Sequence, residues 1–105
     1  MDTLLNQLKE QDLELYQEIV ADLLPSSDHR NNFIICGKLQ EAIRARGWHL
    51  YQIRNDDLPE KPCFVSIYNP TEGIKEHDSH QNGEGSTEAE ALCLAYLEAI
   101  EAVKG

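Results

Sequence analysis

Apolar residues recur every three to four positions through the first 24 residues, the spacing of one face of a helix. Asp12 interrupts that face. Two arrangements are therefore open. Either one long helix carries a polar notch, or a short helix ends near Glu10 and Asp12 caps a second helix that runs to Leu24. Pro25 and the turn-forming residues after it end the helical segment.

A further helical pattern follows, with an apolar stripe that includes Ile35, Leu39 and Ile43. Gly47 comes directly after its last turn. Glycine suits the left-handed conformation that commonly ends a helix, so we expect the helix to stop there.

Three segments predict strands, over residues 48–54, 63–69 and approximately 74–80. Asn69, Pro70 and Gly73 fit a hairpin built on a type I turn, so the last two strands are expected to pair. The third segment is mostly polar, and we expect it at a sheet edge or running out into a loop.

Residues 82–85 have the composition of a flexible linker, and a helix pattern begins after them. Thr87 and Glu90 can form a capping box at its start. The pattern as a whole predicts one α+β domain over residues 1–105. It would comprise an N-terminal helical segment over 1–28 and an α-β-β-β-α unit over 33–105, with a three-stranded antiparallel meander and the C-terminal helix packed on the sheet.

The length and composition set limits on function. A chain of 105 residues, 41% hydrophobic and 27% charged, is sufficient for one globular domain. A domain of this size leaves little room for a deep internal pocket, so a large enclosed active site is not expected.

The three cysteines, Cys36, Cys63 and Cys93, are dispersed and odd in number, so they do not form a closed disulfide framework. Each has apolar neighbours and is expected to behave as a small buried hydrophobe. With no pattern of a signal peptide or membrane span, the sequence predicts a cytoplasmic protein.

Nineteen acidic and nine basic residues give a net charge of −10. This excess disfavours phosphate-backbone binding, so neither a direct nucleic-acid partner nor a membrane partner is expected. It favours encounter with a protein that has a basic surface. The candidate contact residues are Asp56, Asp57, Glu60, Glu72, Glu76 and Asp78.

The basic residues concentrate between positions 29 and 54, several of them close to Trp48. Arginines beside an aromatic ring are typical of an interface hot spot, or of a site for a nucleotide or another small anion. The candidate ligand-binding residues are Arg44, Arg46, Trp48 and Arg54. The alternative, which we favour, is that Trp48 belongs to the core and the arginines balance the acidic segments on either side.

We expect no metal, no cofactor and no catalytic set. His77 and His80 are three positions apart, and residues so spaced on a strand point to opposite faces. Cys63, Ser66 and His49 could be neighbours on adjacent strands, but such coincidences are expected in a half-buried sheet, and the order of residues indicates no nucleophile with a base and a third group to orient it. The sequence therefore predicts a protein that is not an enzyme.

Residues 39–103 combine a helix ending at Gly47-Trp48, a short meander, the run Gly85-Ser86-Thr87-Glu88-Ala89, and a closing helix rich in alanine and leucine. In this order of parts the chain resembles the small phage proteins described as phage ABA-sandwich domains. The resemblance implies an α+β layer fold and a phage origin, and it assigns no catalytic residue.

These observations lead to one hypothesis and one alternative. The hypothesis is a non-enzymatic, phage-type accessory protein that acts by stoichiometric binding, as an acidic inhibitor of a bacterial defence or host protein in the host cytoplasm. The alternative is a binder of a small anionic ligand such as a nucleotide. A homodimer through the apolar N-terminal helices is left open.

Overall fold

The structure is a computed structural model that describes residues 2–25, 28–68 and 80–104. Its N-terminal segment forms two helices, α1 (Asp2–Gln11) and α2 (Leu13–Asp22). Asp12 separates them and caps α2, since its Oδ1 accepts a hydrogen bond from the Leu15 N–H at 3.2 Å. The arrangement with two helices is therefore confirmed, and the polar residue marks a junction rather than a notch in one long helix.

Helix α3 (Asp28–Ala45) follows and ends as the sequence predicts. Gly47 has a φ of 76°, in the left-handed region. Its N–H donates to the Arg44 carbonyl at 2.9 Å, and the Trp48 N–H donates to the Ile43 carbonyl at 3.1 Å. This pair of bonds is a Schellman cap, which satisfies carbonyls at the helix end and turns the chain into the sheet.

The sheet has three antiparallel strands in the order β1 (His49–Arg54), β2 (Cys63–Tyr68) and β3 (His80–Gly85). The first two strands lie where the sequence predicts them, and β2 pairs with β3 as expected. The predicted end of the third strand is wrong: β3 continues from His80 to Gly85, and residues 82–85 are strand rather than linker. The predicted turn at 69–73 and residues 74–79 lie outside the described residues.

Close packing explains why β3 contains glycines. A Cβ atom added at Gly83 would collide with the Ala91 carbonyl oxygen and lie 2.6 Å from the Ala95 nitrogen, both in α4 (Glu88–Lys104). Gly85 is similarly tight against Glu90. The absence of side chains lets α4 lie directly on the strand, so these glycines serve helix–sheet contact rather than chain flexibility.

Helix α4 starts with a partial version of the predicted capping box. The Glu90 N–H donates to Thr87 Oγ1 at 3.2 Å, while the Glu90 carboxylate accepts from Ser86 Oγ at 3.0 Å. Both interactions hold the first turn of α4 next to the end of β3.

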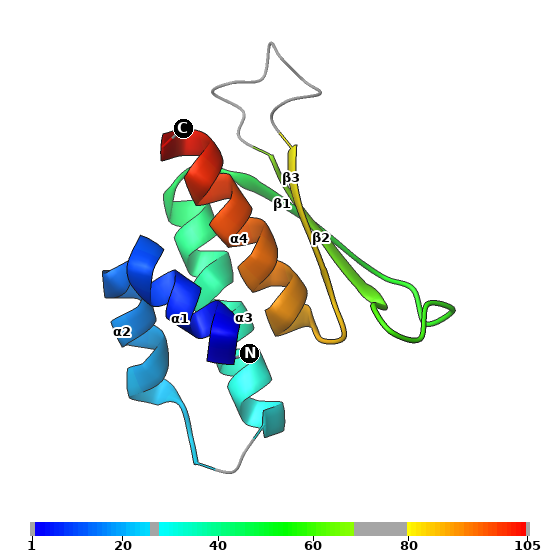
Figure 1. Cartoon of the computed structure of the whole chain (residues 1–105), viewed down its shortest axis with the longest axis horizontal. Coiled ribbons are helices and arrows are strands. Elements are labelled where there is room, and N and C mark those ends of the chain that lie inside the picture. Colours follow the sequence, from blue (N-terminus) through cyan, green and yellow to red (C-terminus); the bar gives the residue numbers. More distant parts are fainter. Residues whose placement is uncertain (1, 26–27, 69–79, 105) are drawn as a thin grey trace.

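The elements form three layers (Figure 1). The sheet is on one side, α4 and α3 form the middle layer, and α1 and α2 pack on the helices away from the sheet. The core lies between these layers and includes the fully buried residues Tyr96, Leu8, Leu39 and Ile67. The α+β class and the packing of the C-terminal helix on the sheet are thus confirmed. Within the described residues, no helix has both the length and the apolar character needed to cross a membrane.

The two faces of the sheet differ in what covers them. Along β2, Cys63, Val65 and Ile67 are buried against the helices, while the alternate residues are only half-buried. The register places Ile53 opposite Phe64 and Tyr51 opposite Ser66 on the other face. No element in the described ranges packs on that second face, which we call the outer sheet face.

Candidate protein-binding surface

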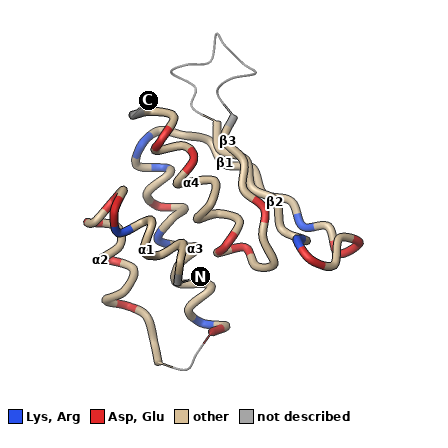
Figure 2. The backbone as a smooth tube through the Cα atoms, in the orientation of Figure 1, with Lys and Arg blue, Asp and Glu red and all other residues tan. Residues whose placement is uncertain are grey.

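The connection between β1 and β2, residues 55–62, is an exposed acidic turn. Asp56, Asp57 and Glu60 are all exposed. Asn55 shapes the turn, because its carbonyl accepts from the Leu58 N–H and its side-chain oxygen accepts from the Asp57 N–H, each at 3.1 Å. Figure 2 shows that charged residues gather at this end of the sheet, beyond the helices. The remaining three candidate contact acids lie outside the described residues: Glu72, Glu76 and Asp78.

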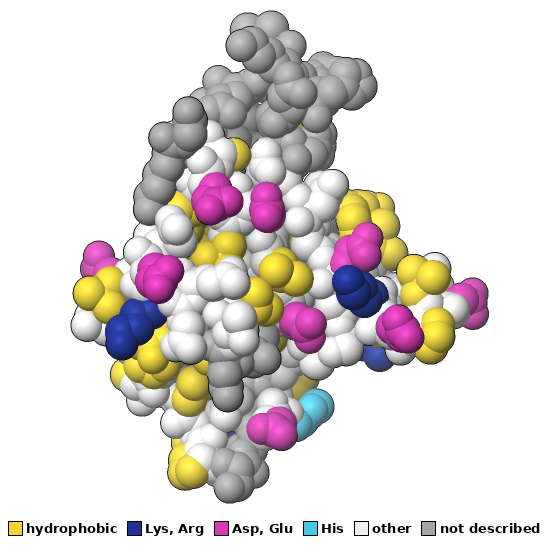
Figure 3. Space-filling model, in the orientation of Figure 1, with side chains coloured by type: hydrophobic (Ala, Val, Ile, Leu, Met, Phe, Trp, Pro, Cys, Tyr) yellow, Lys and Arg dark blue, Asp and Glu magenta, His cyan; other side chains and the backbone are white. Residues whose placement is uncertain are grey.

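The outer sheet face adds apolar surface beside this acidic turn. Tyr51 is 62% exposed, Ile53 is 44% exposed, and Leu58 in the turn itself is 53% exposed. Farther along, the His49 and Tyr68 rings stack with their centres 6.2 Å apart. In Figure 3, hydrophobic side chains lie beside acidic and basic ones on the part of the molecule that projects past α4. Surface of this mixed kind is typical of a protein interface.

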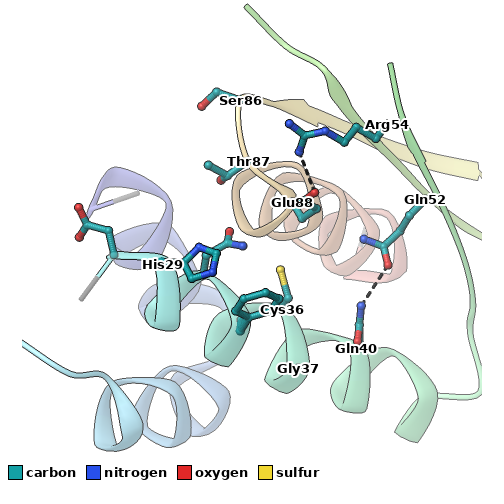
Figure 4. Close-up of a pocket in the computed structure, with 12 residues that line it drawn as sticks. His29, Cys36, Gly37, Gln40, Gln52, Arg54, Ser86, Thr87 and Glu88 are labelled. Atoms are coloured by element: carbon teal, nitrogen blue, oxygen red, sulfur yellow. Dashed lines mark hydrogen bonds and ion pairs between the residues drawn. The ribbon is translucent and has the colours of Figure 1, made fainter. Parts of the chain in front are cut away.

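A groove opens on the other side of β1, between α3, the second half of β1 and the start of α4. Its volume is about 740 Å³. Phe33, Cys36 and Gly37 line it from α3, and Gln52 lines it from β1. The Gln40 side-chain amide Nε2 donates to the Gln52 side-chain Oε1 at 3.0 Å across one end (Figure 4). We call this feature the α3–β1 groove.

An ion pair closes the end of the groove nearest the acidic turn. The Arg54 guanidinium lies 3.0 Å from the Glu88 carboxylate and 2.8 Å from that of Asp56 (Figure 4 shows the first pair). The pKa of the Glu88 carboxyl lies below its ordinary value. The main cause is a hydrogen bond from the Glu88 backbone N–H, and hydrogen bonds from Arg54 and Asn32 lower this pKa further. Glu88 is therefore charged at neutral pH, and Arg54 is neutralised by two carboxylates.

The start of α4 is not an open anion site. Asn32 Oδ1 accepts the Ala89 N–H at 3.1 Å, and Thr87 accepts that of Glu90. These bonds occupy donors that would otherwise attract an anion, and the adjacent Glu88 repels one.

Arg46 and Trp48 do come together, within a partly buried network. The Arg46 guanidinium lies 5.0 Å from the Trp48 ring centre and 5.7 Å from that of Tyr96, and its Nε donates to the Tyr96 hydroxyl at 3.2 Å. The Tyr96 hydroxyl donates to Asp12 at 2.8 Å. Trp48 is only 7% exposed and belongs to the core, as the favoured interpretation expects.

The other two candidate ligand residues do not join this network. Arg44 is exposed on α3, and Arg54 lies at the opposite end of β1 in its ion pairs. The surface hollow beside Arg46 is also lined by Asp12, Glu14 and Glu18. Three carboxylates around one guanidinium disfavour an anionic ligand at this place.

The structure separates Cys63 from the other two residues considered for catalysis. Cys63 faces the buried side of the sheet, Ser66 faces the outer sheet face, and His49 stacks on Tyr68. All three cysteines are buried and unpaired. Burial raises the pKa of Cys36 to about 11 and that of Cys93 to about 12, so both remain thiols at neutral pH rather than reactive thiolates.

Among the described residues, no group of three or more His, Cys, Asp or Glu side chains is arranged to hold a metal ion. His77 and the side chain of His80 lie outside the described part of the chain, so the interpretation of this histidine pair stays a prediction from the sequence.

Sequence reasoning missed the α3–β1 groove and the link between Asp12 and Tyr96. A local signal existed for Asp12, a capping residue between two apolar patterns, but none for its partner 84 positions away. The groove had no local signal, since its lining comes from three separated segments.

Comparison with known proteins finds no match to this chain among family models, curated proteins or solved structures. The resemblance of residues 39–103 to phage ABA-sandwich domains therefore stays a prediction.

Proposed function

We propose that this protein acts by stoichiometric binding to a basic protein surface and catalyses no reaction. The observation that carries the proposal is the continuity of an acidic turn with exposed apolar residues. Asp56, Asp57 and Glu60 adjoin Ile53 and Leu58 at one end of the sheet. Protein interfaces combine an apolar, aromatic centre with a polar rim, and this end of the molecule supplies both.

The electrostatics indicate the sign of the charge on the partner's surface. The net charge of −10 accelerates encounter with a positively charged partner and opposes a negatively charged one. The arginine closest to this surface, Arg54, is already paired with two carboxylates and offers an anion little attraction. A basic protein groove, such as one that normally holds nucleic acid, fits this chemistry.

The resemblance to phage ABA-sandwich domains supplies a context for the proposal. A phage protein of this kind would be an accessory factor that covers the basic surface of a bacterial defence or host protein and inhibits it. The acidic turn would then occupy the place of an acidic ligand.

The test begins with affinity capture from bacterial lysate at low salt, followed by purification of the captured protein and its titration against three versions of this chain. The turn variant carries Asp56→Lys, Asp57→Lys and Glu60→Lys. A matched control carries the same change in net charge at three exposed acids of the helices, Glu10→Lys, Glu98→Lys and Glu101→Lys.

We expect 1:1 binding to a partner with a basic surface, which the turn variant weakens by about tenfold or more and the control by much less, because only close charge pairs couple strongly. Equal weakening by both variants would show that net charge alone drives association. Conversion of the partner or of a small molecule by this chain would overturn the non-enzymatic proposal.

A further inference from the structure

Strand β1 forms one edge of the sheet and has backbone groups directed away from β2. The Asn55 N–H donates to the Pro62 carbonyl at 2.7 Å, which fixes the phase of the antiparallel ladder. Residues at two-residue intervals from Asn55 bond to β2, so the N–H and C=O groups of the alternate set point to the open edge. That set is Leu50, Gln52 and Arg54. Within the described ranges, no backbone hydrogen bond from another element satisfies them.

The same residues direct their side chains to the groove side of the sheet. Gln52 pairs with buried Val65, and Arg54 pairs with buried Cys63. Both also line the α3–β1 groove. A strand added at this edge would therefore place every second side chain in the groove, over Phe33 and Cys36, and the others on the side of the outer sheet face.

The groove is suited to an apolar side chain within acidic surroundings. Phe33 is 64% exposed, and a Cβ atom added at Gly37 would meet nothing within 4 Å, so unfilled space lies against α3. The charged residues that line the groove or form the acidic turn carry a net charge of −3, five acids against two bases. They are Asp28, Asp56, Asp57, Glu60, Glu88, Arg54 and Lys61.

We propose that β1 accepts an extended, basic segment of a protein partner as a fourth strand, with alternate apolar side chains of that segment in the α3–β1 groove. Strand addition supplies affinity through backbone hydrogen bonds and specificity through pockets for alternate side chains. The inference rests on the proposed function and specifies how its partner is held.

Charge selects this occupant over a second copy of the chain. Two copies joined edge to edge would bring together two molecules of charge −10, each with its acidic turn next to the shared edge. A basic segment instead neutralises the surrounding carboxylates.

The probe for this inference is a dye-labelled peptide of eight residues in which lysine and valine alternate. Its binding is followed by fluorescence anisotropy, and amide hydrogen exchange of the complex is read by NMR. Two control peptides replace every lysine by glutamate, or carry N-methyl groups on alternate residues so that one backbone edge cannot pair.

Two variants test the edge and the groove separately. Gln52→Pro removes an N–H that points to the open edge and leaves the hydrogen bonds between β1 and β2 intact. Proline is tolerated in edge strands at positions of this kind. Gln52→Ala is the matched control. Gly37→Leu fills the groove from α3 with a residue that favours helix, so the protein is expected to remain folded.

We expect the lysine–valine peptide to bind and to protect the amides of Leu50, Gln52 and Arg54, while both control peptides bind far more weakly. Gln52→Pro should weaken binding of the peptide by about tenfold relative to Gln52→Ala, which is the effect of one or two lost hydrogen bonds. Gly37→Leu should weaken it similarly while leaving the melting temperature unchanged or higher.

Three results would overturn the inference. The first is salt-sensitive binding of the peptide in which these amides are unprotected and the two Gln52 variants have equal affinity for the peptide. The charge-driven function would then stand without strand addition. The second is no binding of the lysine–valine peptide, and here the charge-reversal titration of the captured partner decides the proposed function separately. The third is a dimer in sedimentation whose β1 amides are already protected, which would identify a second copy as the occupant.

Discussion

The Asp12 side chain contacts three different parts of the fold. One carboxylate oxygen caps α2, and the other accepts from the Tyr96 hydroxyl and lies 3.8 Å from the Arg46 guanidinium. These contacts join the α1–α2 junction to the C-terminal end of α3, where Arg46 follows the helix, and to the middle of α4. Asp12 therefore fixes the outer helical layer on the rest of the fold.

We predict that Asp12→Ala lowers the free energy of unfolding by about 1–3 kcal/mol, since it removes a helix cap and leaves the Tyr96 hydroxyl without its acceptor. Urea unfolding followed by circular dichroism measures the change. Asp22→Ala, which removes an exposed ion pair with Lys38, is the control and should cost clearly less. Equal losses in both variants would contradict a special role for Asp12.

Tyr96 makes the stability of the protein sensitive to alkaline pH. Burial, together with the hydrogen bond to Asp12, raises the pKa of Tyr96 to about 12 from its ordinary value of 10. A raised pKa means that the folded state favours the neutral phenol. Its contribution to stability is therefore complete below about pH 10 and is lost as the pH rises towards 12.

We predict a tyrosine ionisation step near pH 12 in the folded protein, as seen in the ultraviolet absorbance of tyrosinate. Tyr96→Phe should abolish this late step and reduce the loss of stability above about pH 10. Cys36 and Cys93 titrate in the same range, so the comparison is between variant and parent at each pH. Equal tyrosinate absorbance changes near pH 12 in the parent and in the Tyr96→Phe variant would contradict the assignment.

Replacing glycine by alanine is expected to have opposite effects on stability in β3 and in α3. Gly83→Ala should destabilise the protein strongly, because the new methyl group collides with the backbone of α4 and the helix must move off β3. Gly37→Ala adds its methyl group to open space on α3 and should stabilise by about 0.5–1 kcal/mol through helix propensity. Thermal melting of both variants tests the pair. A harmless Gly83→Ala would show that α4 does not lie tightly on β3.

The same contrast explains which elements the sequence could predict. Helix ends have local causes, and Asp12, Gly47 and Thr87 each act within a few residues of their own position. The glycines of β3 have a cause in α4, so their composition indicated a linker where a strand stands. Periodicity predicts elements with a side-chain pattern, and Gly83 and Gly85 on the packed face of β3 contribute no side chain to such a pattern.

At the level of the whole molecule, the candidate surface divides in a similar way. Net charge and the exposed acids of residues 55–62 could be predicted, because charge and polarity hold wherever a turn is placed. The open edge of β1 and the groove beside it could not. They depend on where α3 and α4 leave the sheet uncovered, which only the packed structure determines.

The large negative charge leads to a prediction in which salt has opposite effects on folding and on binding. At −10 the folded chain repels itself, and raising NaCl from 0.01 M to 1 M shortens the screening length from about 30 Å to about 3 Å. We expect the melting temperature to rise over this range, while affinity for a basic partner falls. The control variant Glu10→Lys, Glu98→Lys and Glu101→Lys has a net charge of −4, from −10 + 6, and should gain less from salt. A melting temperature that falls with salt would mean that specific pairs such as Arg54 and Glu88 outweigh the repulsion. The proposal that the exterior is built to meet a basic partner would then lose its electrostatic basis.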